Sequence, residues 1–123
     1  MLEAYSVNTA VAADSAVPFN SVSLIKGCTA THPSPDTINL NKCGVYMVSV
    51  DATAEAETTI QLYKDGVAQP QAQSTGTSLG FVTLVQVDHN NSCCACDSPV
   101  SLQVMNTTAT TLTNANIVVT KVI

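Results

Sequence analysis

Apolar and polar residues alternate one by one along much of this chain, most clearly over residues 44–53. Alternation with a period of two is typical of a β-strand that has one face buried. One side of this predicted strand carries Tyr46, Val48, Val50 and Ala52, and the other carries Met47, Ser49, Asp51 and Thr53. A second strand is predicted over 58–64, and Asp65-Gly66 follows it. Asp-Gly after such a run indicates a tight hairpin turn, because a type I′ turn needs positive φ at both central residues.

The same pattern predicts strands along the rest of the chain and no helix. Further strands are expected over residues 2–11, 17–26, 37–40, 78–88, 100–105 and 117–123. Loops or turns are expected at 28–36, 89–99 and 106–113, and residues 69–77 form an irregular polar edge. Turn signals at this spacing favour an all-β protein, an antiparallel two-sheet jelly-roll sandwich of about eight to ten strands. Residues 1–123 are expected to form a single jelly-roll domain.

Two strands carry apolar residues on both of their faces. In the strand over 78–88, Leu79, Phe81 and Val85 fall on one face, whereas Val82 and Leu84 fall on the other. The C-terminal strand shows the same property. Only 11% of the residues are charged, against roughly 25% in ordinary soluble domains. We therefore expect part of the surface to be buried against other copies of the chain.

The charge balance excludes some classes of partner. The formal net charge is −5, the four basic residues are all lysines, and they form no basic patch, so a nucleic-acid partner is not expected. No apolar run is long enough to span a bilayer, and no membrane association is expected. The first residues lack a positively charged and then apolar leader, so synthesis in the cytoplasm is expected.

The order of these elements resembles a known family. The match is carried by Pro18-Phe19-Asn20, Ile38, Leu40, Gly44, Tyr46 and the final strand. These residues resemble the trimeric jelly roll of tumour necrosis factor, of complement-type globular heads and of the C-terminal domains of bacterial collagen-like exosporium proteins. Within that group the chain is most similar to head-fibre or minor capsid proteins of tailed bacteriophages and prophages, especially over residues 44–74.

The resemblance implies a homotrimer in which one sheet of each protomer faces a three-fold axis. The residues expected to fill the core or the trimer axis are Tyr46, Val48, Val50, Phe81, Ile117 and Val119. It implies a non-enzymatic virion structural protein, made in the cytoplasm of a bacterial host and placed on the capsid surface as a decoration or head-fibre module. Its partners would be copies of itself and a phage major capsid protein or another virion component.

Two other functions remain open at this stage. The first is a receptor- or glycan-binding trimeric head of a bacterial or phage surface fibre, although the predicted loops lack the aromatic residues typical of sugar binding. The second is the head of a spore-surface or collagen-like protein, although this chain contains no Gly-X-Y tract.

The five cysteines are the most distinctive candidates for chemistry. Cys28, Cys43, Cys93 and Cys96, with His89, are candidate ligands of a structural zinc ion, because thiolates and imidazoles are its usual ligands. Free thiols that pack as small apolar groups are one alternative. Disulfides between the loops are another, and they would form after release from the reducing cytosol. Cys43 is expected near the loop over 89–99, and Cys28 at the far end of a short strand. No other cofactor is expected.

No catalytic arrangement is predicted, and the chain is not expected to be an enzyme. His89 lies near Cys93 in sequence, but no strand–turn–helix elbow accompanies them. The carboxylates over 51–57 are read as a solvated bend rather than an acid–base pair or a calcium site. The sequons at 90–92 and 106–108 are expected only to mark surface loops.

Overall fold

The computed structural model describes residues 1–87 and 100–123, and in these residues the chain forms antiparallel strands. The strands are β1 (Leu2–Val11), β2 (Ser15–Ala16), β3 (Ser21–Ile25), β4 (Ala30–Ser34), β5 (Thr37–Leu40), β6 (Gly44–Lys64), β7 (Val67–Val87), β8 (Val100–Asn106) and β9 (Thr110–Lys121). All of these elements are strands, which confirms the all-β prediction. Within the described residues no helix is long and apolar enough to cross a membrane.

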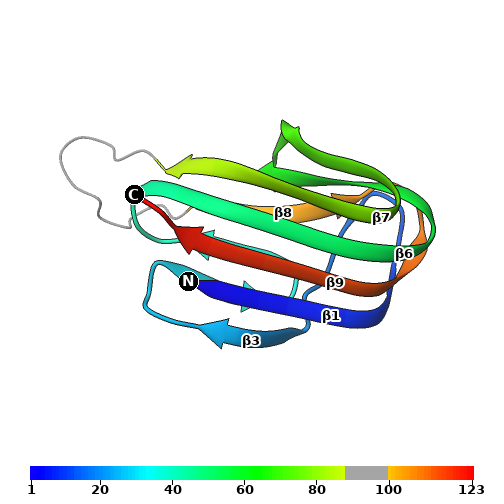
Figure 1. Ribbon diagram of the computed structural model, residues 1–123, viewed down its shortest axis with the longest axis horizontal. Helices are drawn as coiled ribbons and strands as arrows, with labels where there is room; N and C mark the ends of the chain where they lie inside the picture. Colours follow the sequence, from blue (N-terminus) through cyan, green and yellow to red (C-terminus); the bar gives the residue numbers. More distant parts are fainter. Residues whose placement is uncertain (88–99) are drawn as a thin grey trace.

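The strands form two layers, which Figure 1 shows lying over one another. The first layer has the order β3-β1-β9-β6-β7 and uses the first half of β6 and the second half of β7. The second layer has the order β4-β5-β8-β6-β7 and uses the other halves of the two long strands, with β2 paired to β8. All pairings are antiparallel, and this arrangement confirms the predicted jelly-roll sandwich.

Strand β6 joins the two layers. Its even-numbered residues from Tyr46 to Ala54 are buried, as the alternation predicted, and burial on the same side resumes at Thr58. Between these points the pairing with β7 shifts register, and residues 55–57 are exposed. A bulge of this kind bends a strand and increases its twist, which lets one strand serve both sheets. The two predicted strands are thus one continuous bent strand.

The hairpin after β6 has the predicted turn. Asp65 has φ of 51° and Gly66 has φ of 80°, and Lys64 pairs with Val67 across the turn. Both central residues therefore lie in the left-handed region that a type I′ turn requires. The turn fixes which residues of β7 lie opposite β6, and so which residues of β7 face the core.

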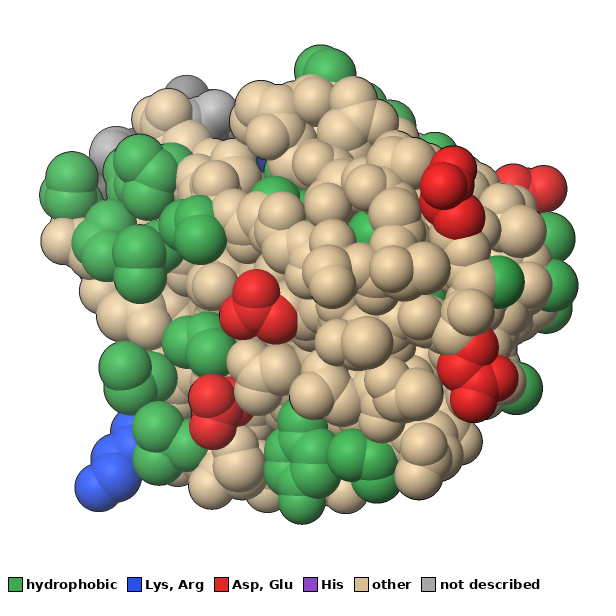
Figure 2. All heavy atoms as spheres, turned by 45° about the vertical axis from the view of Figure 1, so that its right-hand side comes forward, with side chains coloured by type: hydrophobic (Ala, Val, Ile, Leu, Met, Phe, Trp, Pro, Cys, Tyr) green, Lys and Arg blue, Asp and Glu red, His purple; other side chains and the backbone are tan. Residues whose placement is uncertain are grey.

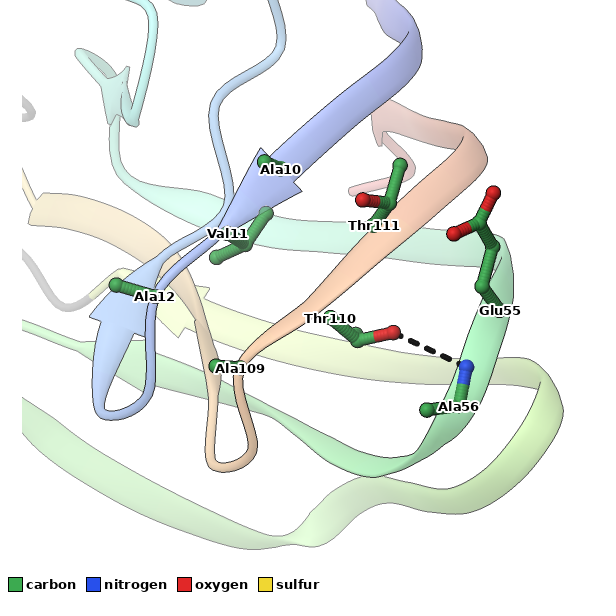
Figure 3. Close-up of a pocket in the computed structure, with 8 residues that line it drawn as sticks. All are labelled: Ala10, Val11, Ala12, Glu55, Ala56, Ala109, Thr110 and Thr111. Atoms are coloured by element: carbon green, nitrogen blue, oxygen red, sulfur yellow. Dashed lines mark hydrogen bonds between the residues drawn. The ribbon is translucent and has the colours of Figure 1, made fainter.

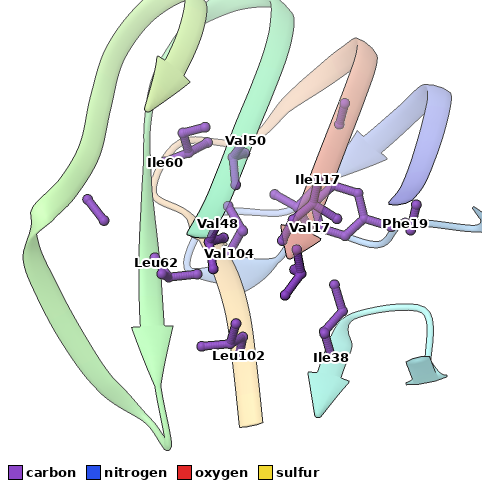
Figure 4. Packing of buried hydrophobic residues seen from close by; sticks show 14 of the residues in the cluster. Val17, Phe19, Ile38, Val48, Val50, Ile60, Leu62, Leu102, Val104 and Ile117 are labelled. Atoms are coloured by element: carbon purple, nitrogen blue, oxygen red, sulfur yellow. The ribbon is translucent and has the colours of Figure 1, made fainter. Parts of the chain in front are cut away.

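The core lies between the two layers and consists mainly of aliphatic side chains (Figure 4). The first layer contributes Val48, Val50 and Ile117, and the second contributes Ile60, Leu62 and Leu102. Phe19, which precedes β3, is also buried. Each fully buried aliphatic side chain of this size contributes about 1.5–3 kcal/mol to folding relative to exposure.

Two predicted boundaries are wrong. Strand β4 lies within the predicted loop 28–36 and pairs with β5. Strand β9 begins at Thr110 rather than near 117, because its threonine-rich start pairs with β1. In both places backbone pairing outweighs the turn propensity of proline, serine and threonine.

Residues 69–77 lie within β7, which is the edge strand of the second layer. Residues 73–76 pair with β6, whereas residues 69–72 fall where the pairing with β6 shifts register. The prediction of an irregular polar edge therefore agrees with the structure.

Candidate functional site

The outer surface of the first layer carries exposed apolar side chains, which we call the assembly face. Its apolar members are Tyr5, Val7, Leu24, Met47, Val82 and Leu84. Val82 is 64% and Leu84 62% exposed, although both lie in the last third of strand β7, where it pairs in register with β6. Figure 2 shows groups of apolar side chains on the left and the lower edge of the surface. Exposed apolar residues that cluster on one sheet are typical of a surface that is covered in an assembly.

The register places part of this face in continuous rows. Leu84 lies beside Met47, and in the next row Val82 lies beside Ser49, with Val118 of β9 on the far side of Ser49. Two carboxylates share the face. Asp51 lies between Gly80 of β7 and Asn116 of β9. Glu3 accepts a hydrogen bond from the Ser23 hydroxyl at 2.6 Å.

A shallow hollow of about 620 Å³ lies at the end of the sandwich, where β1, the bend of β6 and the start of β9 meet (Figure 3). Its lining is Ala10, Val11, Ala12, Glu55, Ala56, Ala109, Thr110 and Thr111. The Thr110 hydroxyl accepts a hydrogen bond from the Ala56 backbone N–H at 3.1 Å. The lining holds one carboxylate and no histidine or cysteine, so it offers no nucleophile–base pair. Glu55 and Glu57 are both exposed at the bend, as predicted for a solvated corner.

A buried polar cluster connects both layers near this end. Asn106 is fully buried, and its side chain accepts a hydrogen bond from the Thr58 hydroxyl. The same amide donates to the backbone oxygens of Ala12 at 3.3 Å and Thr108 at 2.7 Å. The prediction that residue 106 marks a surface loop is therefore wrong. Its amide is needed inside the fold to satisfy backbone groups at a turn.

Two cysteines lie in the described residues, and they differ in chemical state. Cys43 is disulfide-bonded, and Cys28 is an exposed free thiol. The expectation that Cys28 lies at the far end is wrong, because its backbone oxygen accepts a hydrogen bond from Asn41, two residues before Cys43. A disulfide sulfur is not a thiolate, so Cys43 is not available as a zinc ligand in this state.

The remaining zinc candidates, Cys93, Cys96 and His89, lie outside the described residues, as does the sequon at 90–92. Within the described ranges, no group of three or more histidine, cysteine or acidic residues could hold a metal ion.

The residues predicted to pack in the core or on a trimer axis lie on the inner side of the first layer. Tyr46, Val48, Val50, Ile117 and Val119 are fully buried within one chain, and Phe81 is half-buried against them. The Tyr46 hydroxyl donates to the Lys42 backbone oxygen at 2.7 Å. None of the five buried side chains is therefore available to a second copy. The residues available to one are their outward neighbours Met47, Val82 and Leu84.

Two features were not recognised from the sequence. One is the buried role of Asn106, for which the sequence gives no local signal. The other is an uncharged outer surface on the second layer, centred on Tyr63. Gln61 and Tyr63 alternate with the buried Ile60 and Leu62, so the period-two pattern already placed both side chains outward.

Comparison with known proteins gives matches through structure alone. No protein-family model matches the chain, and no curated protein sequence matches it. The globular domain of zebrafish complement 1qA is similar with a TM-score of 0.77 and 9% identity, over 99% of this chain and 96% of that chain. Murine APRIL is similar with a TM-score of 0.69 and 11% identity, over 98% of each chain.

The PRD1 vertex protein P5 is similar with a TM-score of 0.68 and 12% identity, over 99% of this chain and 96% of that chain. At these identities the similarity defines the fold and not the function. The chain therefore has the tumour necrosis factor/complement C1q-type jelly-roll fold, which the vertex protein also matches.

Proposed function

We propose that this chain is a non-enzymatic structural module that assembles into a homotrimer through the assembly face. The observation that carries the proposal is the exposure of Val82 and Leu84 where β7 pairs in register with β6, with Met47 beside them. Burying these apolar side chains in an interface would stabilise the assembly by about 25 cal/mol for each Å² of apolar surface removed from water. The face lies on the first layer, whose strands are joined by continuous antiparallel pairing, and this surface is suited to packing against a second copy.

We further propose that the trimer is a capsid decoration or head-fibre module of a tailed bacteriophage or prophage. The similarity to the PRD1 vertex protein P5 supports a virion role. The resemblance of residues 44–74 to phage head-fibre proteins agrees with this role, although the residues that carry it are structural ones. The protein would be made in the bacterial cytoplasm and placed on the capsid surface, where its partner is the major capsid protein or another virion component.

Native mass spectrometry with light scattering tests the assembly. We expect a trimer for the wild-type chain at micromolar concentration. Leu84→Lys places a charge on the assembly face beside Met47 and should give a monomer, because a buried unpaired charge is strongly unfavourable. Gln73→Lys, on the outer side of the second layer, is the matched control and should remain trimeric. A wild-type monomer would contradict the proposed assembly.

The virion role has a separate test. Capsid and portal genes beside the coding gene, together with the protein in purified particles by mass spectrometry, would support it. Absence of the protein from particles made by the same genome would contradict the virion role while leaving the trimer untouched.

A further inference from the structure

The outer surface of the second layer is a flat array of uncharged hydrogen-bonding side chains, which we call the amide face. It consists of Gln61, Tyr63, Gln73, Gln103, Met105 and Thr37. These residues belong to four strands that are joined through β6 and β8, so the array is carried on paired backbone. None of the six carries a charge, although the chain as a whole has a net charge of −5.

Register places the tyrosine at the centre of this array. Tyr63 lies between Ala68 of β7 and Gln103 of β8, and Gln61 lies between Gln73 and Met105 in the adjacent row. Tyr63 is half-buried, and in the described residues no hydrogen bond involves its hydroxyl. The ring is thus held in the sheet, with a polar group left for a ligand.

The flanking amides are oriented by contacts within the protein. Gln103 Nε2 donates to the Thr37 hydroxyl at 3.2 Å, and Gln61 Nε2 donates to the Gln69 backbone oxygen at 3.1 Å. Each of these amides retains a second N–H and a carbonyl oxygen, for which the described part of the chain provides no partner. Each amide therefore presents a hydrogen-bond donor and an acceptor side by side. Because a contact within the protein already orients each side chain, binding a ligand should cost little further side-chain entropy.

From this arrangement we propose that the amide face binds a neutral polysaccharide. Sugar hydroxyls are uncharged groups that both donate and accept, so paired amide donors and acceptors complement them. The apolar C–H surface of a pyranose ring packs on an aromatic ring such as that of Tyr63. A nucleic acid or an anionic polymer would require basic residues, which this face lacks. The amide face lies on the opposite layer from the assembly face, so the two can be occupied together.

Affinity electrophoresis in native gels tests this directly, with dextran, yeast mannan and hydroxyethyl cellulose as neutral probes and polygalacturonate as the charged comparison. We expect at least one neutral polymer to retard the wild-type protein and polygalacturonate to leave it unretarded. Tyr63→Ala should weaken retardation at least tenfold. Both tyrosine variants are compared in the Leu84→Lys background, because Tyr5 belongs to the assembly face and its loss could otherwise act through the trimer. In that background Tyr5→Ala is the matched control, because it removes an exposed tyrosine from the opposite layer, and it should bind as its parent does.

Gln103→Ala provides a second variant in case Tyr63→Ala unfolds, and thermal unfolding is recorded for each protein. We expect Gln103→Ala to weaken retardation several-fold at unchanged melting temperature. The proposal is overturned if no neutral polymer retards the wild type, if polygalacturonate does so equally, or if Tyr63→Ala binds like Tyr5→Ala. It is also overturned if Gln73→Lys changes the oligomeric state, because this face would then be a contact between copies.

Discussion

Replacement of Asn106 by leucine should destabilise the protein more than any change of similar size on its surface. The side chain is fully buried and makes three hydrogen bonds, one from the Thr58 hydroxyl and two to the backbone oxygens of Ala12 and Thr108. Leucine has a similar volume but can make none of them. At about 1 kcal/mol for each bond, the free energy of unfolding should fall by about 3 kcal/mol.

The backbone oxygens explain why the loss should reach this size. The Thr58 hydroxyl keeps a second acceptor, the Thr108 oxygen at 3.3 Å, so it is not left without a partner. The Ala12 oxygen has no such substitute among the hydrogen bonds of the described residues. Ala12 is exposed, so water can reach its oxygen, and the lower end of the cost of about 1–3 kcal/mol for an acceptor that loses its donor applies there.

Urea unfolding followed by circular dichroism measures this change, in a Leu84→Lys background so that association between copies does not contribute. Asn20→Leu, the same substitution at an exposed position, is the control and should change the stability by less than about 0.5 kcal/mol. In the double variant with Thr58→Val, the loss of unfolding free energy should be smaller than the sum of the two single losses. Each single variant already removes the hydrogen bond between Thr58 and Asn106, so the sum counts that bond twice. A loss below about 1 kcal/mol for Asn106→Leu would refute the reasoning.

Three further outcomes are expected. Gly44→Ala should lower the unfolding free energy by more than about 2 kcal/mol in urea titration, because a Cβ there would clash with the Ile123 backbone oxygen at a φ of 140°, where alanine is strained; a loss below 0.5 kcal/mol would contradict this. Asp51→Asn should tighten the trimer about tenfold by sedimentation, since covering the assembly face desolvates this carboxylate; weaker association would show that Asp51 has a partner across the interface. A maleimide should label Cys28 in the native protein and leave Cys43 unlabelled until reduction, and equal labelling would contradict the disulfide.

Much of the fold is encoded in local pattern. The alternation from Tyr46 to Val50 correctly gives the side of β6 that is buried, because a strand can bury one face only if apolar residues recur every second position. Asp65-Gly66 correctly gives the hairpin, since few other residue pairs adopt positive φ at both positions. The same period places Val82 and Leu84 together on the face opposite Phe81 and Val85.

Other properties were decided only by pairing between distant segments. Residues 110–113 look like part of a threonine-rich turn by composition, yet they form the start of β9 because β1 supplies their hydrogen-bond partners. Asn106 looks like a loop residue, yet it is buried because the turn before β9 and the end of β1 both present backbone oxygens to it. Neither effect is visible in a window of neighbouring residues, because the groups that stabilise each segment are far away in sequence.

The same division holds for the two candidate surfaces. The period of two by itself determined that Leu84 lies on the face opposite Phe81 and Val85, and Tyr63 on the face opposite Leu62. Only the structure shows which of these faces is turned away from the core. Only the tertiary structure decided that Leu84 and Tyr63 lie on opposite layers. The pairing of β6 with β7 shifts register between Thr53 and Thr58 of β6, opposite residues 76–78 of β7, and there each strand bends and passes from one sheet to the other. That bend gives one chain two separate outer faces, one apolar and one of uncharged amides.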